Sequence, residues 1–340
     1  MISQKQIDEI RHHLDAAENP LFIWDGDTDG LCSFLLLRRH AGKGNYIIAR
    51  DGPDVTLDLL KQVNEISPDK IFILDKPLVS QEFIDGANVP IIWLDHHMPV
   101  ERKGVRYYNP RIENVKHEQC TTYWAYEVVK KDIWIAMMGI VADWRTDHIA
   151  EFAKKYPGLI KHKVKIAPDV LYNTELGRLI RYTAFMLKGK MKDVRKNVDM
   201  MISMTSPYEL LNEESGKAKK LMVYAKKLDK VYDGLLKKAL ENKADDKFFL
   251  FLYPNGKHSF TGELSNELIY RMPDKFIIVA RQKEDKVIMS LRGNKWFIPA
   301  IIDQAKEGIG GYGGGHDHAC GASVPKDNFN KFVERIKKLI

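Results

Sequence analysis

The sequence predicts an α/β fold in which a parallel-sheet domain at residues 1–185 is joined by a helical connector at 186–245 to a smaller α/β domain at 246–340. Two observations predict this organisation. The first half of the chain alternates short apolar runs with segments of helical spacing, which is typical of a parallel sheet buried on both faces. A second alternation follows a long stretch of helical spacing, and 340 residues are enough for two domains with separate cores.

Four strands are predicted in the first domain. Each is a run of four mostly apolar residues, at 21–24, 46–49, 71–74 and 91–94. Helices are expected at 31–40, 55–66, 121–131 and 133–144. Three of the strands are followed directly by an acid, namely Asp25, Asp75 and Asp95. Because parallel strands bring their carboxyl ends to one edge of the sheet, where ligands bind in this architecture, we expect these acids to share that edge.

The rest of the chain is predicted to be a helical segment followed by the second domain. From 172 to 242 apolar residues recur three and four positions apart with lysines on the opposite face, and the later part is interpreted as the connector. In the second domain, strands are predicted at 248–253, 275–281, 287–292 and 318–324, and helices at 262–271, 297–306 and 328–339. A glycine-rich loop is predicted at 310–316.

Composition and charge indicate which partners and which cellular compartment to expect for the protein. The net charge of +7 agrees with an acidic partner such as nucleic acid, although solubility alone is the more frequent reason for such an excess. Three cysteines lie far apart and form no CxxC pair, so a reducing cytoplasm is expected. The N-terminus lacks an apolar signal region, and the apolar run 34–37 is far too short to span a membrane, so no membrane partner is expected.

A first group of acidic residues follows the first strand. Asp25, Asp27 and Asp29 lie within five residues, in a turn that contains glycine, and such carboxylates repel one another unless a cation neutralises them. A polar turn with a helix N-cap at Asp29 would explain one of these acids and not three. A calcium-binding EF-hand would need a loop of about 12 residues closed by glutamate. An apolar helix follows instead, so we predict a different kind of cation site.

The fourth strand ends in Asp95-His96-His97. Adjacent histidines at a strand end point in different directions, so one can bind a metal ion while the other faces a substrate. The aspartate can orient a ring nitrogen. Carboxylate and imidazole together suit Mn²⁺ or another first-row divalent ion better than Ca²⁺. A histidine pair alone is more often ordinary surface, and His12-His13 lacks the strand context and is assigned no role.

Glycines are concentrated near the C-terminus, before His316. Gly313, Gly314 and Gly315 would let backbone N–H groups approach a phosphate, which His316 could bind or protonate. A flexible linker is the alternative. The compact apolar segment at 319–324 favours an ordered loop.

In their order and spacing these motifs resemble the DHH phosphoesterase superfamily with its DHH-associated C-terminal domain, which includes RecJ exonucleases and nano-RNases. The resemblance covers nearly the whole chain. It is carried by the Asp25-Gly-Asp27-Thr-Asp29-Gly30 motif, Asp75, Asp95-His96-His97, Asp143 in Gly139-Ile-Val-Ala-Asp143, Ser290-Leu-Arg292 and Gly313-Gly-Gly-His316.

The resemblance implies two divalent metal ions, with manganese favoured and magnesium or cobalt as alternatives. Its implied ligands are Asp27 for one ion, Asp29 for the other, Asp75 bridging both, His96 and Asp143 completing the second site, and Asp25 as an extra carboxylate beside the first. Ile23 stands where some members carry a metal-binding histidine, or Leu21 does if Asp25 and Asp27 form the metal-binding pair, so the first site is expected to bind weakly or to use Asp25 or water. Asp75 is followed by Lys76-Pro77 rather than by the usual small or polar residues.

The resemblance also implies roles in catalysis and substrate binding. His97 would face the scissile phosphate beside Asp95. Arg292 and His316 would grip the phosphate or the terminal nucleotide with the glycines that precede His316, and Asn109 and Arg111 would line the substrate channel.

We therefore expect a metal-dependent phosphodiesterase that acts as an exonuclease on single-stranded nucleic acid or short oligonucleotides and releases nucleoside monophosphates. The alternatives are a phosphodiesterase of cyclic or linear dinucleotides and a replication scaffold without catalysis. Scaffold relatives have eroded metal sites, whereas the ligand set here is complete. Replication or repair proteins are further expected partners.

Overall fold

The computed structural model describes residues 1–50, 52, 54–160, 164–242 and 245–340. The chain divides into two compact units, Met1–Ala225 (unit 1) and Lys226–Ile340 (unit 2). The division falls inside one long helix, α12 (Gly216–Glu241), which supplies residues to both units. No helix in the described part of the chain is both long and apolar enough to cross a membrane.

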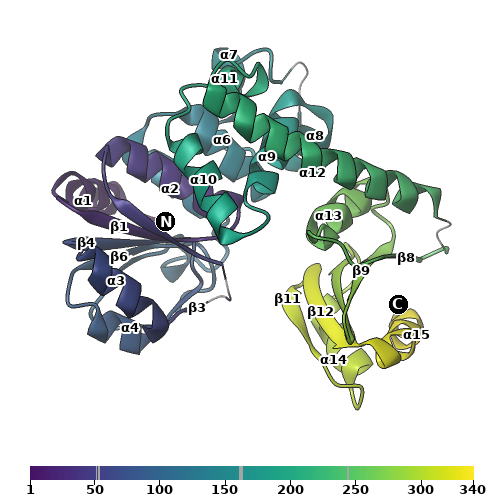
Figure 1. Cartoon of the computed structure of the whole chain (residues 1–340). Coiled ribbons are helices and arrows are strands. Elements are labelled where there is room, and N and C mark those ends of the chain that lie inside the picture. Colours follow the sequence, from purple (N-terminus) through teal and green to yellow (C-terminus); the bar gives the residue numbers. More distant parts are fainter. Residues whose placement is uncertain (51, 53, 161–163, 243–244) are drawn as a thin grey trace. The chain divides into compact units, whose positions relative to one another are not determined.

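Unit 1 is built around a parallel sheet of five strands (Figure 1). In spatial order they are β2 (Asn45–Ala49), β1 (Pro20–Asp25), β4 (Lys70–Leu74), β6 (Ile91–Leu94) and β7 (Arg106–Tyr108). The first four are the strands predicted from the apolar runs, so the parallel-sheet architecture of this domain is confirmed. The sequence pattern does not predict β7, because it has only three residues and begins with an exposed arginine.

The sheet is covered on both faces, as its wholly apolar strands require. Successive strand residues point to opposite faces. Phe22 and Trp24 pack in the larger hydrophobic cluster of unit 1, and Ile23 packs in the smaller one. The larger cluster includes α1 (Gln4–Asp15), α2 (Thr28–Ala41), α5 (Thr121–Val129) and α6 (Ile133–Ala142), and the smaller includes α3 (Leu60–Ile66) and α4 (Gln81–Gly86). The helix predicted at 55–66 begins late, because β3 (Asp54–Val55) pairs with β5 (Leu78–Val79).

The helical segment that follows the sheet is divided into separate helices. These are α7 (Ile149–Lys155), α8 (Ala167–Asn173), α9 (Glu175–Met186), α10 (Met191–Ile202), α11 (Pro207–Leu211) and α12. Thr174 has an extended backbone and caps α9, and Gly189, with a φ of 114°, separates α9 from α10. Val194, Val198 and Leu221 pack in the larger cluster, so much of the segment predicted as a connector belongs to the core of unit 1.

Unit 2 has its own five-stranded sheet and its own hydrophobic core. In spatial order the strands are β11 (Tyr312–His316), β12 (Ala319–Pro325), β10 (Lys286–Arg292), β9 (Phe276–Lys283) and β8 (Phe248–Tyr253). β8 is parallel to β9, and the other neighbours are antiparallel. The helices are α13 (Thr261–Arg271), α14 (Ile298–Lys306) and α15 (Phe329–Leu339). The prediction of a smaller α/β domain is confirmed.

The glycine-rich segment is the main correction in unit 2. It is not a loop but the edge strand β11, which pairs antiparallel with β12. Glycine is needed because this strand packs closely. A Cβ atom at Gly313 would lie 2.6 Å from a methyl carbon of Ile302, and one at Gly315 would lie 2.5 Å from the Ala319 carbonyl oxygen, at a φ of 146°.

Candidate metal centre

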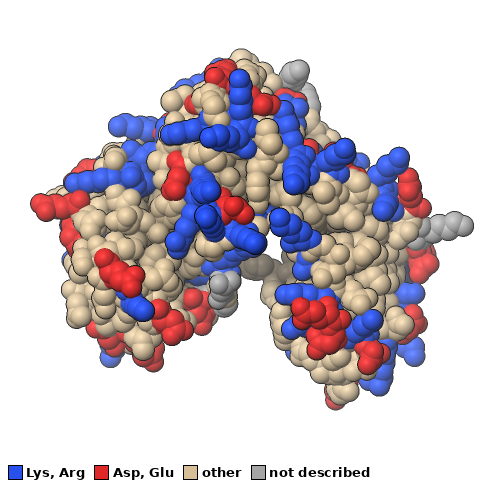
Figure 2. All heavy atoms as spheres, viewed as in Figure 1, with Lys and Arg blue, Asp and Glu red and all other residues tan. Residues whose placement is uncertain are grey.

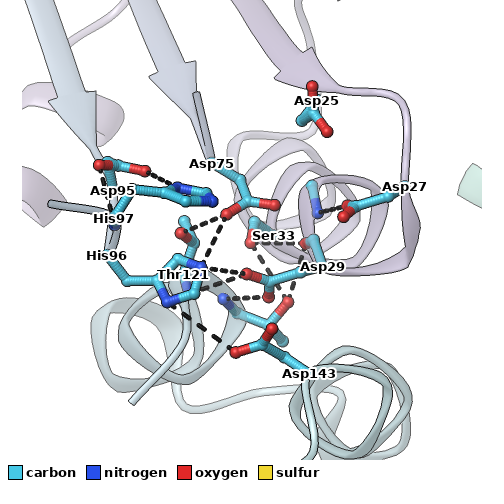
Figure 3. Close-up of polar contacts among 12 residues, drawn as sticks. Asp25, Asp27, Asp29, Ser33, Asp75, Asp95, His96, His97, Thr121 and Asp143 are labelled. Atoms are coloured by element: carbon cyan, nitrogen blue, oxygen red, sulfur yellow. Dashed lines mark hydrogen bonds and ion pairs between the residues drawn. The ribbon is translucent and has the colours of Figure 1, made fainter. Parts of the chain in front are cut away.

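The acidic motifs meet at the carboxyl edge of the unit 1 sheet (Figure 3). Asp75 follows β4, and Asp95 with its two histidines follows β6. Asp27 and Asp29 lie at the start of α2, and Asp143 follows the last residue of α6. The close-up shows Asp29, Asp75, His96 and Asp143 directed toward one another, and Asp95 turned toward His97 beside them, so residues far apart in sequence form one polar cluster.

His96 lies at the centre of this cluster. Its Nε2 is 3.4 Å from Asp75 Oδ1 and 3.8 Å from Asp29 Oδ2, and its Nδ1 is 3.9 Å from Asp143 Oδ2. Burial lowers the pKa of His96, although the charge of Asp29 opposes this effect. A neutral imidazole among three carboxylates has the donor chemistry of a first-row divalent metal site.

The first turn of α5 holds two of the carboxylates in place. The backbone N–H groups of Thr121 and Thr122 donate to Asp29 Oδ2 and Oδ1 at 3.0 and 2.8 Å. The Thr121 hydroxyl donates to Asp75 Oδ1 at 3.0 Å. A helix N-terminus favours negative charge, so α5 both orients and stabilises these acids. The threonine pair at the start of a predicted helix is the sequence signal that would have indicated this role.

The carboxylates carry more negative charge than the protein itself balances. Asp75 is 2% exposed, and burial together with the charges of Asp29 and Asp27 raises its pKa well above the usual range. Burial and the same two charges raise the pKa of Asp143. Asp27 reaches the surface, where water screens part of the repulsion, yet desolvation and its acidic neighbours still raise its pKa to about 6. Excess negative charge on carboxylate oxygens favours divalent cations, so the side chains present here suit a divalent metal site.

The backbone of Asp75 has an unusual conformation. Its φ of 59° lies in the left-handed region, which residues other than glycine rarely adopt. The Thr121 hydroxyl and the turn after β4 hold the side chain toward the cluster. Backbone strain of this kind is concentrated at functional sites.

Asp95 and His97 form a separate hydrogen-bonded pair beside the cluster. His97 Nδ1 lies 2.7 Å from Asp95 Oδ1, and Asp95 is fully buried. Burial alone would lower the pKa of His97, but the hydrogen bond to Asp95 and the charge of that acid raise it. The pair therefore favours a proton on Nδ1 and leaves Nε2 for another partner.

Two groups of three side chains at this centre are close enough together to hold a metal ion. Within the described ranges, Asp75, His96 and His97 offer donor atoms within 4.8 Å of one another, and Asp29, Cys120 and Asp143 do the same. Cys120 was absent from the expected ligands. A single buried cysteine before a predicted helix gives no distinctive sequence signal.

Asn109 and Arg111 both lie near the histidines that follow β6. Asn109, expected to line a substrate channel, is 5% exposed. Its amide donates to Asp95 Oδ2 at 3.1 Å and to the His97 carbonyl oxygen at 2.9 Å. Asn109 therefore fixes the loop that carries the histidines. Arg111 is half-buried, and its charge contributes to the lowered pKa of His96.

Asp25 has a partner that the sequence analysis missed. It was expected as an extra metal ligand, but its Oδ1 accepts a hydrogen bond of 2.7 Å from the ammonium of Lys76. Lys76 is fully buried. Figure 3 shows the Asp25 carboxylate apart from the other labelled acids. A lysine after an acidic strand end resembles a surface residue in sequence, which is why its role is not predictable from the pattern.

The expected substrate-binding residues of unit 2 lie at the ends of two strands. Arg292 ends β10, and its Nε donates to Asn266 Oδ1 at 2.6 Å while Nη1 donates to the carbonyl oxygens of Leu291 and Cys320. His316 ends the exposed edge strand β11.

The excess of carboxylates predicts how the metal-free protein responds to pH. The pKa of Asp75 and of Asp143 is higher in the folded than in the unfolded state. The stability that this difference contributes is fully present below about pH 4 and is lost as the pH rises through the folded-state values. The chelated protein should therefore resist urea better at about pH 5 than at about pH 7.5, and Asp143→Asn should reduce the difference. If the stability to urea of wild type and of Asp143→Asn changed equally with pH, this assignment would be contradicted.

Comparison with known proteins places the two units in known domain families. Residues 22–153 match the DHH family N-terminal domain, and residues 247–340 match the DHHA1 domain. An uncharacterized protein of Methanocaldococcus jannaschii is 23% identical over an alignment 403 positions long. The alignment covers 92% of this chain and 91% of that protein.

Solved structures share the fold. RecJ from Thermus thermophilus in complex with Mn²⁺ superposes with a TM-score of 0.69 at 15% identity, over 100% of this chain. The chain spans 55% of that protein. An exonuclease RecJ bound to manganese gives a TM-score of 0.61 at 15% identity, over 98% of this chain and 94% of that one.

Proposed function

Because the chain belongs to the DHH superfamily of phosphoesterases and carries a DHHA1 domain, we propose that it is a metal-dependent phosphodiesterase that removes nucleoside monophosphates from one end of single-stranded nucleic acid or short oligonucleotides. One observation carries the proposal. Three carboxylates, from Asp29, Asp75 and Asp143, face the His96 imidazole at 3.4–3.9 Å. A complete donor set of this kind also argues against a scaffold without catalysis.

The donor set is divided between two ions in this proposal. Asp29, Asp75, His96 and Asp143 would hold one ion, and Asp27 with Asp75 would hold the other. Manganese is favoured, with magnesium or cobalt as alternatives, and the two similar RecJ structures contain manganese. When bound, divalent ions lower the pKa of water and supply positive charge to a phosphoryl transition state.

The protein's own groups would position the substrate and form a hydrogen bond with it. Asp95 holds the Nδ1 proton of His97, so the imidazole is fixed in one tautomer with Nε2 directed away from Asp95. His97 would face the scissile phosphate and, in the protonated form that Asp95 favours, donate a hydrogen bond from Nε2 to it. The amide of Asn109 keeps Asp95 and the His97 backbone in register, and thus acts through the histidine rather than on the substrate.

Charge supports a polyanionic substrate. The net charge is +7, and Figure 2 shows lysines and arginines gathered over the helices that follow the sheet of unit 1. Lys190, Lys192, Arg195 and Lys196, on and just before α10, are all exposed. Positive charge attracts the phosphates of nucleic acid independently of sequence. In unit 2, Arg292, His316 and the glycines of β11 would bind the terminal nucleotide.

The test is a substrate panel. The protein with Mn²⁺ would be incubated with end-labelled DNA and RNA ladders, linear and cyclic dinucleotides, and pyrophosphate. We expect ladders to shorten one nucleotide at a time with release of monophosphates. Hydrolysis of dinucleotides alone would replace the exonuclease by a dinucleotide phosphodiesterase, and no hydrolysis of any phosphodiester would contradict the proposal.

Arg292→Ala tests the role of unit 2. An arginine–phosphate contact is charge-assisted, and its loss costs about 2–3 kcal/mol. We expect a roughly 30–150-fold lower catalytic efficiency on oligonucleotides, a much smaller loss on a small chromogenic phosphodiester, and unchanged metal content.

The matched control for this variant is Arg335→Ala. Arg335 also belongs to unit 2 and also donates to backbone carbonyls, those of Ala305 and Glu307. Its loss should leave the ratio of the two efficiencies unchanged. If Arg292→Ala instead lowers both efficiencies equally and reduces metal content, Arg292 supports the fold and not the substrate.

A further inference from the structure

Lys76 is a buried cation at the edge of the metal centre. Its side chain has no exposed surface, and its ammonium donates to Asp25 Oδ1 at 2.7 Å and to the carbonyl oxygens of Ala49 and Gly52 at 3.0 and 2.8 Å. An ammonium has three N–H donors, so these three acceptors satisfy it completely. Burying a lysine is costly unless it is paired, and here the pairing is complete.

The backbone around Lys76 keeps the ammonium in this position. Asp75, directly before it, has a φ of 59°. The Asp75 carboxylate is directed toward His96 and not toward Asp25, the partner of Lys76. The Lys76 carbonyl oxygen accepts a hydrogen bond of 2.9 Å from the fully buried Trp93 indole. Two adjacent residues thus place one negative and one positive charge at the carboxyl edge of the sheet.

The pairing changes the number of acids that remain for cations. Asp25 is matched by Lys76 and Asp95 is paired with His97, which leaves the four carboxylates of Asp27, Asp29, Asp75 and Asp143. Four negative charges equal the charge of two divalent ions. At the upstream position, Ile23 is fully buried in the smaller hydrophobic cluster and supplies no donor.

We propose that Lys76 makes the two metal positions unequal, because its ammonium withdraws Asp25 from metal binding and places a fixed positive charge beside that carboxylate, two residues before Asp27. The proposal rests on the proposed function and adds an order of binding to it. The metal position formed by His96, Asp29 and Asp143 binds one ion tightly in the free protein. The position of Asp27 binds its ion weakly until the substrate phosphate adds donors. Lys76 is a positioning residue in this scheme.

The experiment measures Mn²⁺ binding without substrate. Calorimetric titration and native mass spectrometry would be applied to wild type, Lys76→Met, Asp25→Asn and the double variant. Wild type should bind one ion tightly and one weakly. Lys76→Met should raise the Mn²⁺ affinity of the weak position about tenfold or more, because a unit positive charge is removed and the Asp25 carboxylate becomes available. Asp25→Asn should weaken it, since Lys76 then carries an unmatched charge, and the double variant should return close to wild type.

The control is Lys70→Met, which removes a half-buried lysine from the opposite end of β4, where it pairs with Asp69. Its titration should match that of wild type. If Lys76→Met does not fold, Asp25→Asn still tests the proposal, because the two variants shift the weak position in opposite directions.

The outcomes separate the two proposals. Two ions of equal affinity in wild type, or an unchanged weak position in Asp25→Asn, would overturn the role of Lys76 and leave the phosphodiesterase intact. A wild-type protein that binds no Mn²⁺ at all would overturn the metal-dependent function itself.

Discussion

Replacing Asp75 by asparagine should lower turnover on an oligonucleotide by about 10³-fold or more, as loss of a major electrostatic contribution does in other enzymes. Asparagine keeps the shape of the side chain and tolerates the left-handed backbone at this position, so the fold should survive. It removes a negative charge that lies 3.4 Å from His96 and is assigned to both ions. Its amide nitrogen is a donor and cannot bind a cation.

The measurement is turnover under saturating Mn²⁺ together with metal content. Asp85→Asn is the control, because Asp85 is an exposed acid on α4 whose loss removes the same charge from the protein. It should retain activity. Turnover near that of wild type in Asp75→Asn, with two ions still bound, would refute the assignment of Asp75 as the shared ligand.

Removing metal should abolish hydrolysis completely. Without cations, Asp29, Asp75 and Asp143 repel one another and also an incoming phosphate, so the centre loses both its affinity for substrate and its source of positive charge. Adding Mn²⁺ to the chelated protein should restore activity. Ca²⁺ should restore little, because it prefers a larger set of oxygen ligands than a site containing imidazole offers.

Circular dichroism of the chelated protein is the control for this experiment, since the loss of activity should occur without loss of helix or strand. Undiminished hydrolysis by a thoroughly metal-stripped sample would eliminate the mechanism.

Sequence patterns identified the features of the fold that depend on burial. A central parallel strand is apolar on both faces, so β1, β4 and β6 appear as unbroken apolar runs, and the acids at their ends follow directly. Short elements such as β7 bury too few residues to leave such a pattern. The breaks within the long helical segment depend on single caps such as Thr174, which are easily overlooked among strong helical spacing.

The candidate site was partly predictable for a related reason. Acids and histidines stand out in a sequence because they are rarely placed together after apolar strands. Their partners do not stand out. Thr121 acts on Asp75 across 46 positions of sequence, and Lys76 meets Asp25 across 51, so only the folded chain brings them together. The glycines near the C-terminus were assigned to a loop, because a strand of glycines has no side chains that would indicate pairing with β12.

The position of β8 at one edge of the unit 2 sheet has a consequence for handling the protein. β8 is a six-residue apolar strand, Phe248–Tyr253, and Leu252 remains 47% exposed. Edge strands that are apolar and uncharged act as templates for pairing with other chains. We therefore expect partial unfolding of unit 2 to favour aggregation through β8. Leu252→Lys should reduce the aggregation of heated or concentrated samples, measured by light scattering. It should leave metal binding by unit 1 unchanged.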